Sequence, residues 1–211
     1  MINLQEIIPI FPLEGVVIFP NTYLPLNIFE PRYLKMIEYA ISEENRLIGM
    51  VQPKQPQDKN NDVELYKVGC AGKIIKFEET EDSRYLITLK GVSRFNILSD
   101  TTNSDNYREA KVNWEDYKED LDKKSSNENF DSLKKVLKDY FKIKKMRVNT
   151  EIIDACNDYN LVDQLTMICP LNFQEKQLLL ETKLIAKRNT LLKSIIDSYL
   201  TEVNISDTIK H

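Results

Sequence analysis

The chain has 211 residues, of which 29% are charged and 42% are hydrophobic, proportions typical of a soluble globular protein. This length is enough for one large domain or two small ones with a buried core. The formal net charge of -4 does not favour binding to nucleic acid or to an anionic membrane. With only five glycines, the sequence also excludes wide glycine-rich loops.

The N-terminal stretch MINLQEIIPIFPLEG is apolar but does not have the pattern of a signal peptide. It lacks a basic start and is interrupted by Pro9 and Pro12. No run in the sequence approaches the roughly 18 apolar residues that a membrane span needs. Three widely spaced cysteines without a CxxC pair are typical of reduced, buried thiols. We therefore expect a cytoplasmic protein that does not bind membranes.

The first half of the chain predicts a β-rich lobe with one inserted helix. Short runs of β-branched and aromatic residues, separated by turn signals, indicate strands. A helix is expected over 31–44, because Pro31 suits a first helical turn and Leu34, Ile37 and Ile41 have helical spacing. The expected strands cover residues 7–11, 16–19, 24–28, 47–52, 66–78, 84–89, 92–98 and 108–114.

Three glycines lie within or between the predicted strands, and their positions predict local features of the backbone. The strands at 66–78 and 84–89 form a predicted hairpin around the turn ETEDS. Gly69 and Gly72 in its first arm indicate a bulge or a close approach of another backbone. Gly91 is expected to turn the chain from one strand into the next.

The second half changes character after a charged segment. Residues 115–129, EDYKEDLDKKSSNEN, show no apolar face and are interpreted as a boundary or linker. Beyond them the apolar period becomes helical. Helices are expected at 130–141, 152–155 and 161–168, and a long one opens at Asn172, which has capping-box spacing to Glu175, and continues to Tyr199.

The predicted fold class is therefore α+β. A β-rich lobe covers residues 1–118, a linker covers 119–129, and a C-terminal helical bundle covers 130–205.

Three blocks of the sequence carry a family resemblance. They are, in chain order, IPIFPLEGVVIFPNTYLPLNIFEPRYLKMIEYAI, VGCAGKIIKFEETEDSRYLITLKGVSRF and LTMICPLNFQEKQLLLE. Together they resemble the N-terminal, substrate-binding domain of Lon proteases over about residues 4–203. The resemblance implies a PUA-like pseudo-barrel lobe followed by a helical bundle, and a role in recognising unfolded or tagged polypeptides.

No ATPase or protease motif accompanies these blocks. The P-loop pattern G-x-x-x-x-G-K-[ST] is absent, since Gly72 and Lys73 are followed by Ile74. Because the sequence ends at His211, we expect a stand-alone member of the family, without motor or protease. The leading hypothesis is a non-enzymatic module that binds unfolded or extended polypeptide, as an adaptor to a separate ATP-dependent protease.

We expect no catalytic, cofactor or metal site. The single histidine is His211, so histidine-based metal sites and catalytic triads are excluded. Two acidic pairs, Glu78 with Glu79 and Glu81 with Asp82, could in principle transfer protons. They border a hairpin turn, however, where acidic side chains are normally only solvated.

The stretch Phe29-Glu30-Pro31-Arg32-Tyr33 marks where a helix follows a strand. Glu30 suits the positive end of the helix dipole, whereas Arg32 in the same turn needs a carboxylate partner. Two interpretations stay open. Glu30 and Arg32 form a structural ion pair, or together they line a groove for a peptide.

Aromatic residues of the hairpin region give a second candidate. Phe77, Tyr85 and Phe95 either form an apolar patch for a non-native chain or belong to the core. An exposed strand edge is a third candidate, because extended polypeptide can pair with it through main-chain hydrogen bonds. The sequence does not say which edge is open.

A basic helical face supports the alternative hypothesis, a PUA-like RNA-binding protein. Its residues are Lys134, Lys138, Lys142 and Lys145. The face could bind an acidic partner or an RNA backbone, or it could be the solvated side of a bundle helix. The acidic segment before it and the acidic net charge favour the second interpretation and disfavour nucleic acid.

Overall fold

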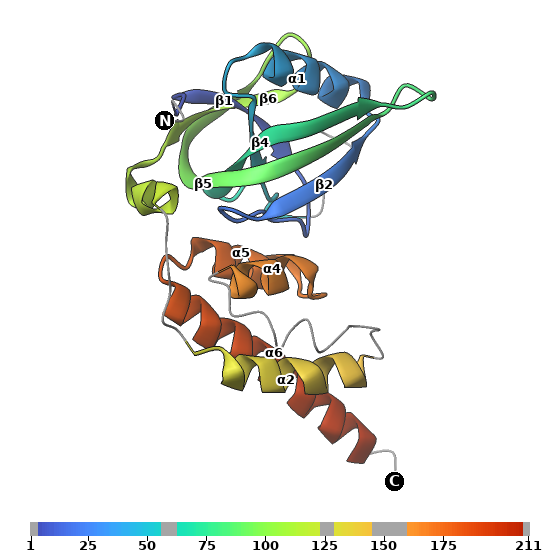
Figure 1. The fold of residues 1–211 in the computed structure, drawn as a ribbon, viewed down its shortest axis with the longest axis vertical. Coiled ribbons are helices and arrows are strands. Elements are labelled where there is room, and N and C mark those ends of the chain that lie inside the picture. Colours follow the sequence, from blue (N-terminus) through green and yellow to red (C-terminus); the bar gives the residue numbers. More distant parts are fainter. Residues whose placement is uncertain (1–3, 56–62, 123–128, 145–159, 209–211) are drawn as a thin grey trace. The chain divides into compact units, whose positions relative to one another are not determined.

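The computed structural model describes residues 4–55, 63–122, 129–144 and 160–208 (Figure 1). The chain divides into two compact units, Met1–Lys123 with Pro170–Leu180, and Lys124–Cys169 with Glu181–His211. This division differs from the expectation at one point, because residues 170–180 belong with the strands and not with the helical bundle.

The first unit contains a six-stranded mixed sheet and the inserted helix that the sequence predicted. Its elements are β1 (Ile7–Pro12), β2 (Tyr23–Ile28), α1 (Pro31–Ser42), β3 (Leu47–Val51), β4 (Val68–Glu79), β5 (Tyr85–Thr102), β6 (Arg108–Asn113) and the 3-10 helix η1 (Glu115–Leu121). The strand order is β2-β5-β4-β3-β1-β6, and β6 also pairs with β5. This second pairing closes five strands into a pseudo-barrel. Among the strand pairs of the described residues, only β1–β3 is parallel.

Strand β5 is 18 residues long and has different neighbouring strands along its length (Figure 1). Its first part pairs with β2, from Tyr85 to Lys90, and its last part pairs with β6, from Asn96 to Thr102. Strand β4 pairs with β5 from Tyr85 to Asn96, along the whole of the first part and only to the start of the last part. The first part of β5 therefore joins β2 and the end of β4 in a three-stranded extension of the barrel.

The prediction of two strands separated by a turn at Gly91 was wrong. A Cβ atom at Gly91 would lie 1.9 Å from the carbonyl oxygen of Phe19, so the glycine allows another segment to approach the strand. The Gly91 N–H donates to the Thr22 carbonyl, and the Asn21 N–H donates to the Gly91 carbonyl, both at 2.9 Å. The approaching segment, 16–19, is buried but forms no strand, contrary to the prediction.

The core of the barrel depends on another close approach. Phe95 is fully buried, and a Cβ atom at Gly69 would lie 2.6 Å from its ring. The β4–β5 register also shifts between Ala71 and Gly72. The register shift, together with the Met50 carbonyl oxygen that a Cβ atom at Gly69 would meet at 2.7 Å, confirms the predicted bulge or close backbone approach. Around Phe95 lie aliphatic side chains of β1, β3, β5 and β6, among them Ile8, Ile10, Leu47, Val51, Ile97 and Val112.

A buried ion pair ties η1 to β5. Arg94 is 2% exposed and Asp120 is 7% exposed. Arg94 donates from Nε and Nη2 to the two Asp120 carboxylate oxygens, both at 2.9 Å, and from Nη1 to the Leu180 carbonyl at 3.0 Å. Burial lowers the pKa of Arg94, but the hydrogen bond and charge of Asp120 outweigh it, and the pKa is raised.

The segment interpreted as a linker is therefore structured at its start. Tyr117 and Asp120 are buried, and the Arg94 guanidinium lies 4.5 Å from the centre of the Tyr117 ring. Asp120 and Arg94 are 26 positions apart. No local pattern in the sequence connects them.

Helix α5 (Phe173–Glu181) begins at the predicted capping box. The Asn172 N–H donates to the Glu175 carboxylate at 2.9 Å, and the Glu175 N–H donates to the Asn172 side-chain oxygen at 2.8 Å. Gln177 bonds the barrel directly, since it donates to the Val68 carbonyl and accepts from Gln52, both at 3.0 Å. These buried contacts explain why α5 belongs to the first unit.

The second unit contains α2 (Asp131–Ile143), α4 (Leu161–Ile168) and α6 (Ile185–Thr208). Helices at 130–141 and 161–168 were predicted, whereas the helix expected at 152–155 lies outside the described residues. The expected single helix from 172 to 199 is two helices. Arg188 forms a buried ion pair with Asp163 at 2.8 Å and donates to the carbonyls of Thr182 and Lys183, which lie in the interruption.

Removal of the Asp120 carboxylate tests this account of the first unit. We expect Asp120→Ala to lower the free energy of unfolding by about 3–5 kcal/mol, because Arg94 would stay buried without its carboxylate. Urea denaturation followed by the fluorescence of Trp114 measures the change. The control is Glu115→Ala in the same 3-10 helix, whose ion pair with Lys118 is largely exposed and should contribute less than about 1 kcal/mol. Equal losses in the two variants would contradict the account.

Candidate functional site

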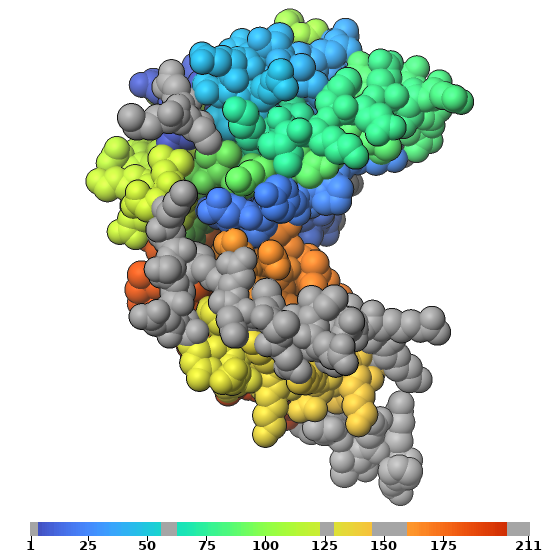
Figure 2. All heavy atoms as spheres, viewed as in Figure 1, coloured from blue at the N-terminus to red at the C-terminus, as the bar shows by residue number. Residues whose placement is uncertain are grey.

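Exposed aromatic side chains lie at the end of the three-stranded extension. We call this site the hairpin end and define it as Phe29, Phe77, Arg84 and Tyr85. Phe29 is 63% exposed and Phe77 is 44% exposed. The rings of Phe77 and Tyr85 meet edge to face with centres 4.9 Å apart, and the Arg84 guanidinium lies 5.9 Å from the Phe29 ring. The space-filling view shows the hairpin and α1 side by side on the surface (Figure 2).

Phe95, the third aromatic candidate, does not lie at the hairpin end. Phe95 is fully buried in the barrel core, so the patch interpretation was wrong for this residue. Phe77 is exposed and Tyr85 is half-buried, and these two do lie together on the surface.

Acidic side chains surround the hairpin end. Glu78, Glu79 and Glu81 are all exposed, and within the described residues no ion pair neutralises them. Asp82, in contrast, pairs with Arg84 at 2.7 Å, and a hydrogen bond from Thr80 together with the Arg84 charge lowers its pKa. The hairpin end is thus an apolar surface with excess negative charge at its rim.

The predicted ion pair at the start of α1 is present. Arg32 donates from Nη2 and Nε to one Glu30 oxygen at 2.8 and 3.1 Å, and its guanidinium lies 4.5 Å from the centre of the Tyr33 ring. Tyr33 is buried, and this burial raises its pKa. Glu30 makes no side-chain hydrogen bond to cap the helix. The pair orders the chain directly after Phe29, and a direct role in binding stays a prediction.

Helix α1 also contacts the hairpin through a carboxylate. The Glu38 carboxylate accepts from the Lys35 ammonium at 2.8 Å and from the Tyr85 hydroxyl at 3.0 Å. These hydrogen bonds, with that of Lys35 the larger cause, lower the pKa of Glu38. The contact places Tyr85 against α1.

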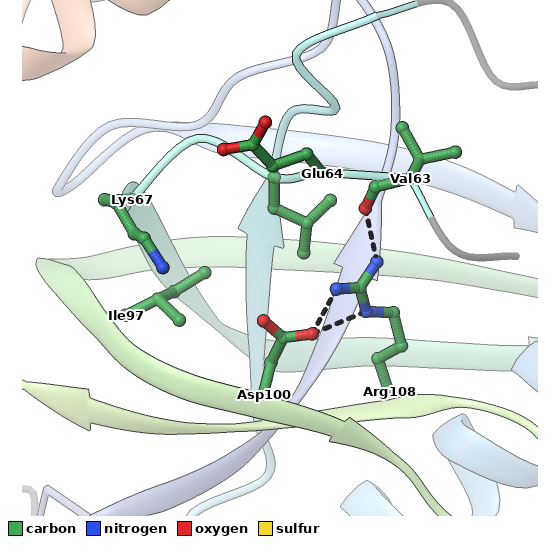
Figure 3. A pocket seen from close by; sticks show the side chains of 7 residues that line it. Val63, Glu64, Lys67, Ile97, Asp100 and Arg108 are labelled. Carbon is green, nitrogen blue, oxygen red and sulfur yellow. Dashed lines mark hydrogen bonds and ion pairs between the residues drawn. The ribbon is translucent and has the colours of Figure 1, made fainter.

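A polar hollow of about 250 Å³ lies elsewhere on the barrel (Figure 3). Arg108 points into it and donates to the Asp100 carboxylate at 2.8 Å and to the Val63 carbonyl at 2.7 Å. Lys67 and Glu64 lie at its rim. The Arg108 charge is already compensated by Asp100, so the hollow offers little attraction for an anion. Sequence reasoning missed this hollow, because its residues come from separate strands.

A second hollow, of about 350 Å³, lies across β2, β5 and the end of β4. Its lining combines apolar side chains, such as Pro25 and Leu86, with Lys76 and Glu78. It belongs to the same three-stranded extension as the hairpin end. No local sequence pattern indicates this hollow, because it forms only when the three strands are paired.

The basic face of α2 is not a continuous solvated surface. Lys134 is only 5% exposed, Lys138 is half-buried, and Lys142 is exposed. Lys145 lies outside the described residues. Burial of Lys134 removes one cation from the surface that was considered for RNA.

Within the described residues, no group of three or more histidine, cysteine or acidic side chains could hold a metal ion. Cys70 and Cys169 are buried thiols. In the same part of the chain, no helix combines the length and the apolar composition needed to cross a membrane.

A family model described as "ATP-dependent protease La (LON) substrate-binding domain" matches residues 7–198. The chain belongs to this family. Among curated proteins, it is similar to the Lon protease of Buchnera aphidicola subsp. Acyrthosiphon pisum, with 25% identity over 97% of this chain and 26% of that protein. It is also similar to the Lon protease 1 of Syntrophobacter fumaroxidans, with 24% identity over 95% of this chain and 24% of that protein. The chain thus spans about a quarter of the length of these relatives.

Two solved structures share the fold of this Lon substrate-binding domain. The N-terminal domain of a Mycobacterium avium complex Lon protease matches with a TM-score of 0.65 and 14% identity, over 90% of this chain and 98% of that one. A Lon N-terminal domain protein from Xanthomonas campestris matches with a TM-score of 0.60 and 17% identity, over 89% and 97%. These matches confirm the predicted α+β fold.

The contact between Glu38 and Tyr85 can be tested by titration. We expect Tyr85→Phe to raise the pKa of Glu38 towards its usual value, because a hydrogen bond to the carboxylate is lost. Lys35→Met should raise it further. Since the folded pKa is lowered, the contact stabilises the fold above the unfolded pKa, and this contribution is lost as the pH falls through the folded pKa.

Carbon-13 NMR of the Glu38 carboxyl group follows this titration. Tyr66→Phe, a variant of another partly exposed tyrosine, serves as the control and should leave the Glu38 pKa unchanged. An identical Glu38 pKa in the wild type and in Tyr85→Phe would show that the hydroxyl does not bond the carboxylate in solution.

Proposed function

We propose that this chain binds unfolded or extended polypeptide and catalyses no reaction itself. Membership of the family described as the substrate-binding domain of an ATP-dependent protease supports the proposal, as do the names of its relatives, which are Lon proteases. The single observation that carries it is the exposure of Phe29 and Phe77 at one end of the extension. Large apolar side chains grouped at a surface are typical of an interaction site.

The chemistry of the hairpin end suits a non-native chain. Unfolded segments expose apolar side chains, and burying these against Phe29 and Phe77 removes apolar surface from water on both sides. Aromatic rings provide such contact area with few rotatable bonds. Tyr85 is held by Glu38, so part of the surface is ordered before a ligand binds.

The proposed consequence of binding is delivery to proteolysis. The relatives named Lon protease extend far beyond the region that they share with this chain. We infer that the bound polypeptide passes to an ATP-dependent protease activity, whether that activity belongs to the same polypeptide or to a separate protein for which this chain acts as an adaptor.

Fluorescence anisotropy tests the proposal. The probe is fluorescein-labelled lysozyme that has been reduced and carbamidomethylated, which keeps it permanently unfolded. We expect saturable binding that weakens by about fivefold or more in Phe29→Ser and in Phe77→Ser, because truncation of a central aromatic contact typically costs more than 1 kcal/mol. The control is Leu98→Ser, which changes an exposed apolar residue of β5 outside the hairpin end, and it should bind like the wild type.

The alternative hypothesis is tested in the same format. A labelled single-stranded RNA of similar mass should not bind at moderate salt. Binding of RNA with a steep salt dependence, together with no binding of the unfolded lysozyme, would overturn the proposal in favour of a nucleic-acid function.

A further inference from the structure

The three-stranded extension has two outer edges. Strand β2 pairs only with β5, so its other edge is open within the described residues. Strand β3 pairs with β4 only as far as Lys73, and the Ile74 N–H donates to the Arg46 carbonyl. From residue 75 to residue 79, β4 pairs with β5 alone among the described residues. Open edges are templates for pairing with another chain.

The alternation of hydrogen bonds along the β4–β5 ladder shows which main-chain groups of β4 point toward its open edge. The Thr80 N–H donates to the Arg84 carbonyl at 2.9 Å, so these residues form a hydrogen-bonded pair. Such pairs alternate along an antiparallel ladder, and the next ones are Glu78 with Leu86 and Lys76 with Thr88. The main-chain N–H and C=O groups of Phe77 and Glu79 therefore point away from β5, toward the open edge.

The β2 edge presents fewer main-chain hydrogen-bond donors to an added strand. The Gly91 N–H donates to the Thr22 carbonyl at 2.9 Å, and by the same alternation Leu24 and Leu26 bond β5. The groups that point outward belong to Tyr23, Pro25 and Asn27. Pro25 has no N–H to donate, and a proline at this place protects an edge strand from pairing. Of the two open edges, only that of β4 has a donor at each outward position.

We propose that an extended polypeptide segment docks as an added strand on the β4 edge over residues 75–79, and that the site prefers segments that combine apolar and basic residues. This inference rests on the proposed function and deepens it. Main-chain bonds to Phe77 and Glu79 hold the segment without regard to its sequence. The side chains around the edge then select among segments.

Charge complementarity decides the preference for basic residues. Glu78 and Glu79 on the edge and Glu81 in the turn are exposed carboxylates, opposed by Lys76 and by Arg84, which is already paired with Asp82. An incoming segment with lysine or arginine meets this excess negative charge. Its apolar residues meet Phe77, which is 44% exposed, and Ile75, which is 50% exposed and lies in the bulge that ends the edge.

The first experiment compares proline substitutions on the two edges. Glu79→Pro removes an N–H that points outward and no bond of the β4–β5 ladder, but it also removes a carboxylate, so it is compared with Glu79→Gln, which removes the charge alone. Asn27→Pro removes the outward N–H on the β2 edge. The probe is a fluorescein-labelled peptide of alternating lysine and valine. We expect the Kd for Glu79→Pro to be about three- to tenfold higher than for Glu79→Gln, because one main-chain hydrogen bond is lost and the proline ring clashes with the docked strand. Asn27→Pro should leave the Kd unchanged.

The second experiment changes the peptide and leaves the protein intact. A peptide of alternating glutamate and valine should bind at least about tenfold more weakly than the lysine peptide at low salt, and the difference should shrink as salt is added. N-methylation of both the valine and the lysine amides, which removes the N–H donors from both edges of the peptide, should abolish binding of the lysine peptide.

The outcomes separate this inference from the proposed function. If the unfolded lysozyme binds, but Glu79→Pro and N-methylation have no effect, the edge inference is wrong and the function stands. If Asn27→Pro weakens binding and Glu79→Pro does not, the inference is also wrong. If no unfolded polypeptide binds the wild type, both the edge inference and the proposed function are wrong.

Discussion

The main-chain hydrogen bonding of β5 is the constraint on which the first unit depends. A strand of 18 residues is longer than the barrel requires, and its first part must find partners elsewhere. Those partners are β2 and the end of β4, which continue along β5 after β3 has stopped pairing with β4. The mismatch in strand length creates the extension, its open edges and the exposed end where Phe29 and Phe77 lie.

A buried polar network secures the base from which this extension projects. Arg94 lies on β5 between the two pairing regions and bonds both η1 and the last turn of α5. Such a pair stabilises the fold only when each member has its partners, and it defines one arrangement of the elements around it. A rigid base suits a site whose bound partner is itself unstructured, because the ordering cost then falls mainly on the partner.

Local chemistry made much of this fold predictable. The turn ETEDS predicted the hairpin, Pro31 predicted the start of α1, and the Asn172–Glu175 spacing predicted the start of α5. The failures come from contacts between distant residues. Gly91 was interpreted as a turn, although it makes room for the Phe19 carbonyl, and the segment around Asp120 looked like a linker because its partner Arg94 is far away in sequence.

The candidate site was predictable only in part for the same reason. Phe77 was identified from its residue type, but nothing local distinguished it from the buried Phe95, and Phe29 was noted only as part of the stretch at the start of α1. The choice between the two strand edges required the register of three strands, since only the register shows that Pro25 faces outward on one edge and that Phe77 and Glu79 face outward on the other.

Hydrogen exchange of individual backbone amides, measured by NMR with and without a saturating unfolded polypeptide, tests the central claim most directly. The account predicts that the amides of Phe77 and Glu79, which exchange through an open edge in the free protein, become protected when the polypeptide binds. It predicts no added protection for Tyr23 and Asn27 on the β2 edge. Protection confined to another surface, with the amides of β4 unchanged, would contradict the claim that polypeptide is recognised at the hairpin.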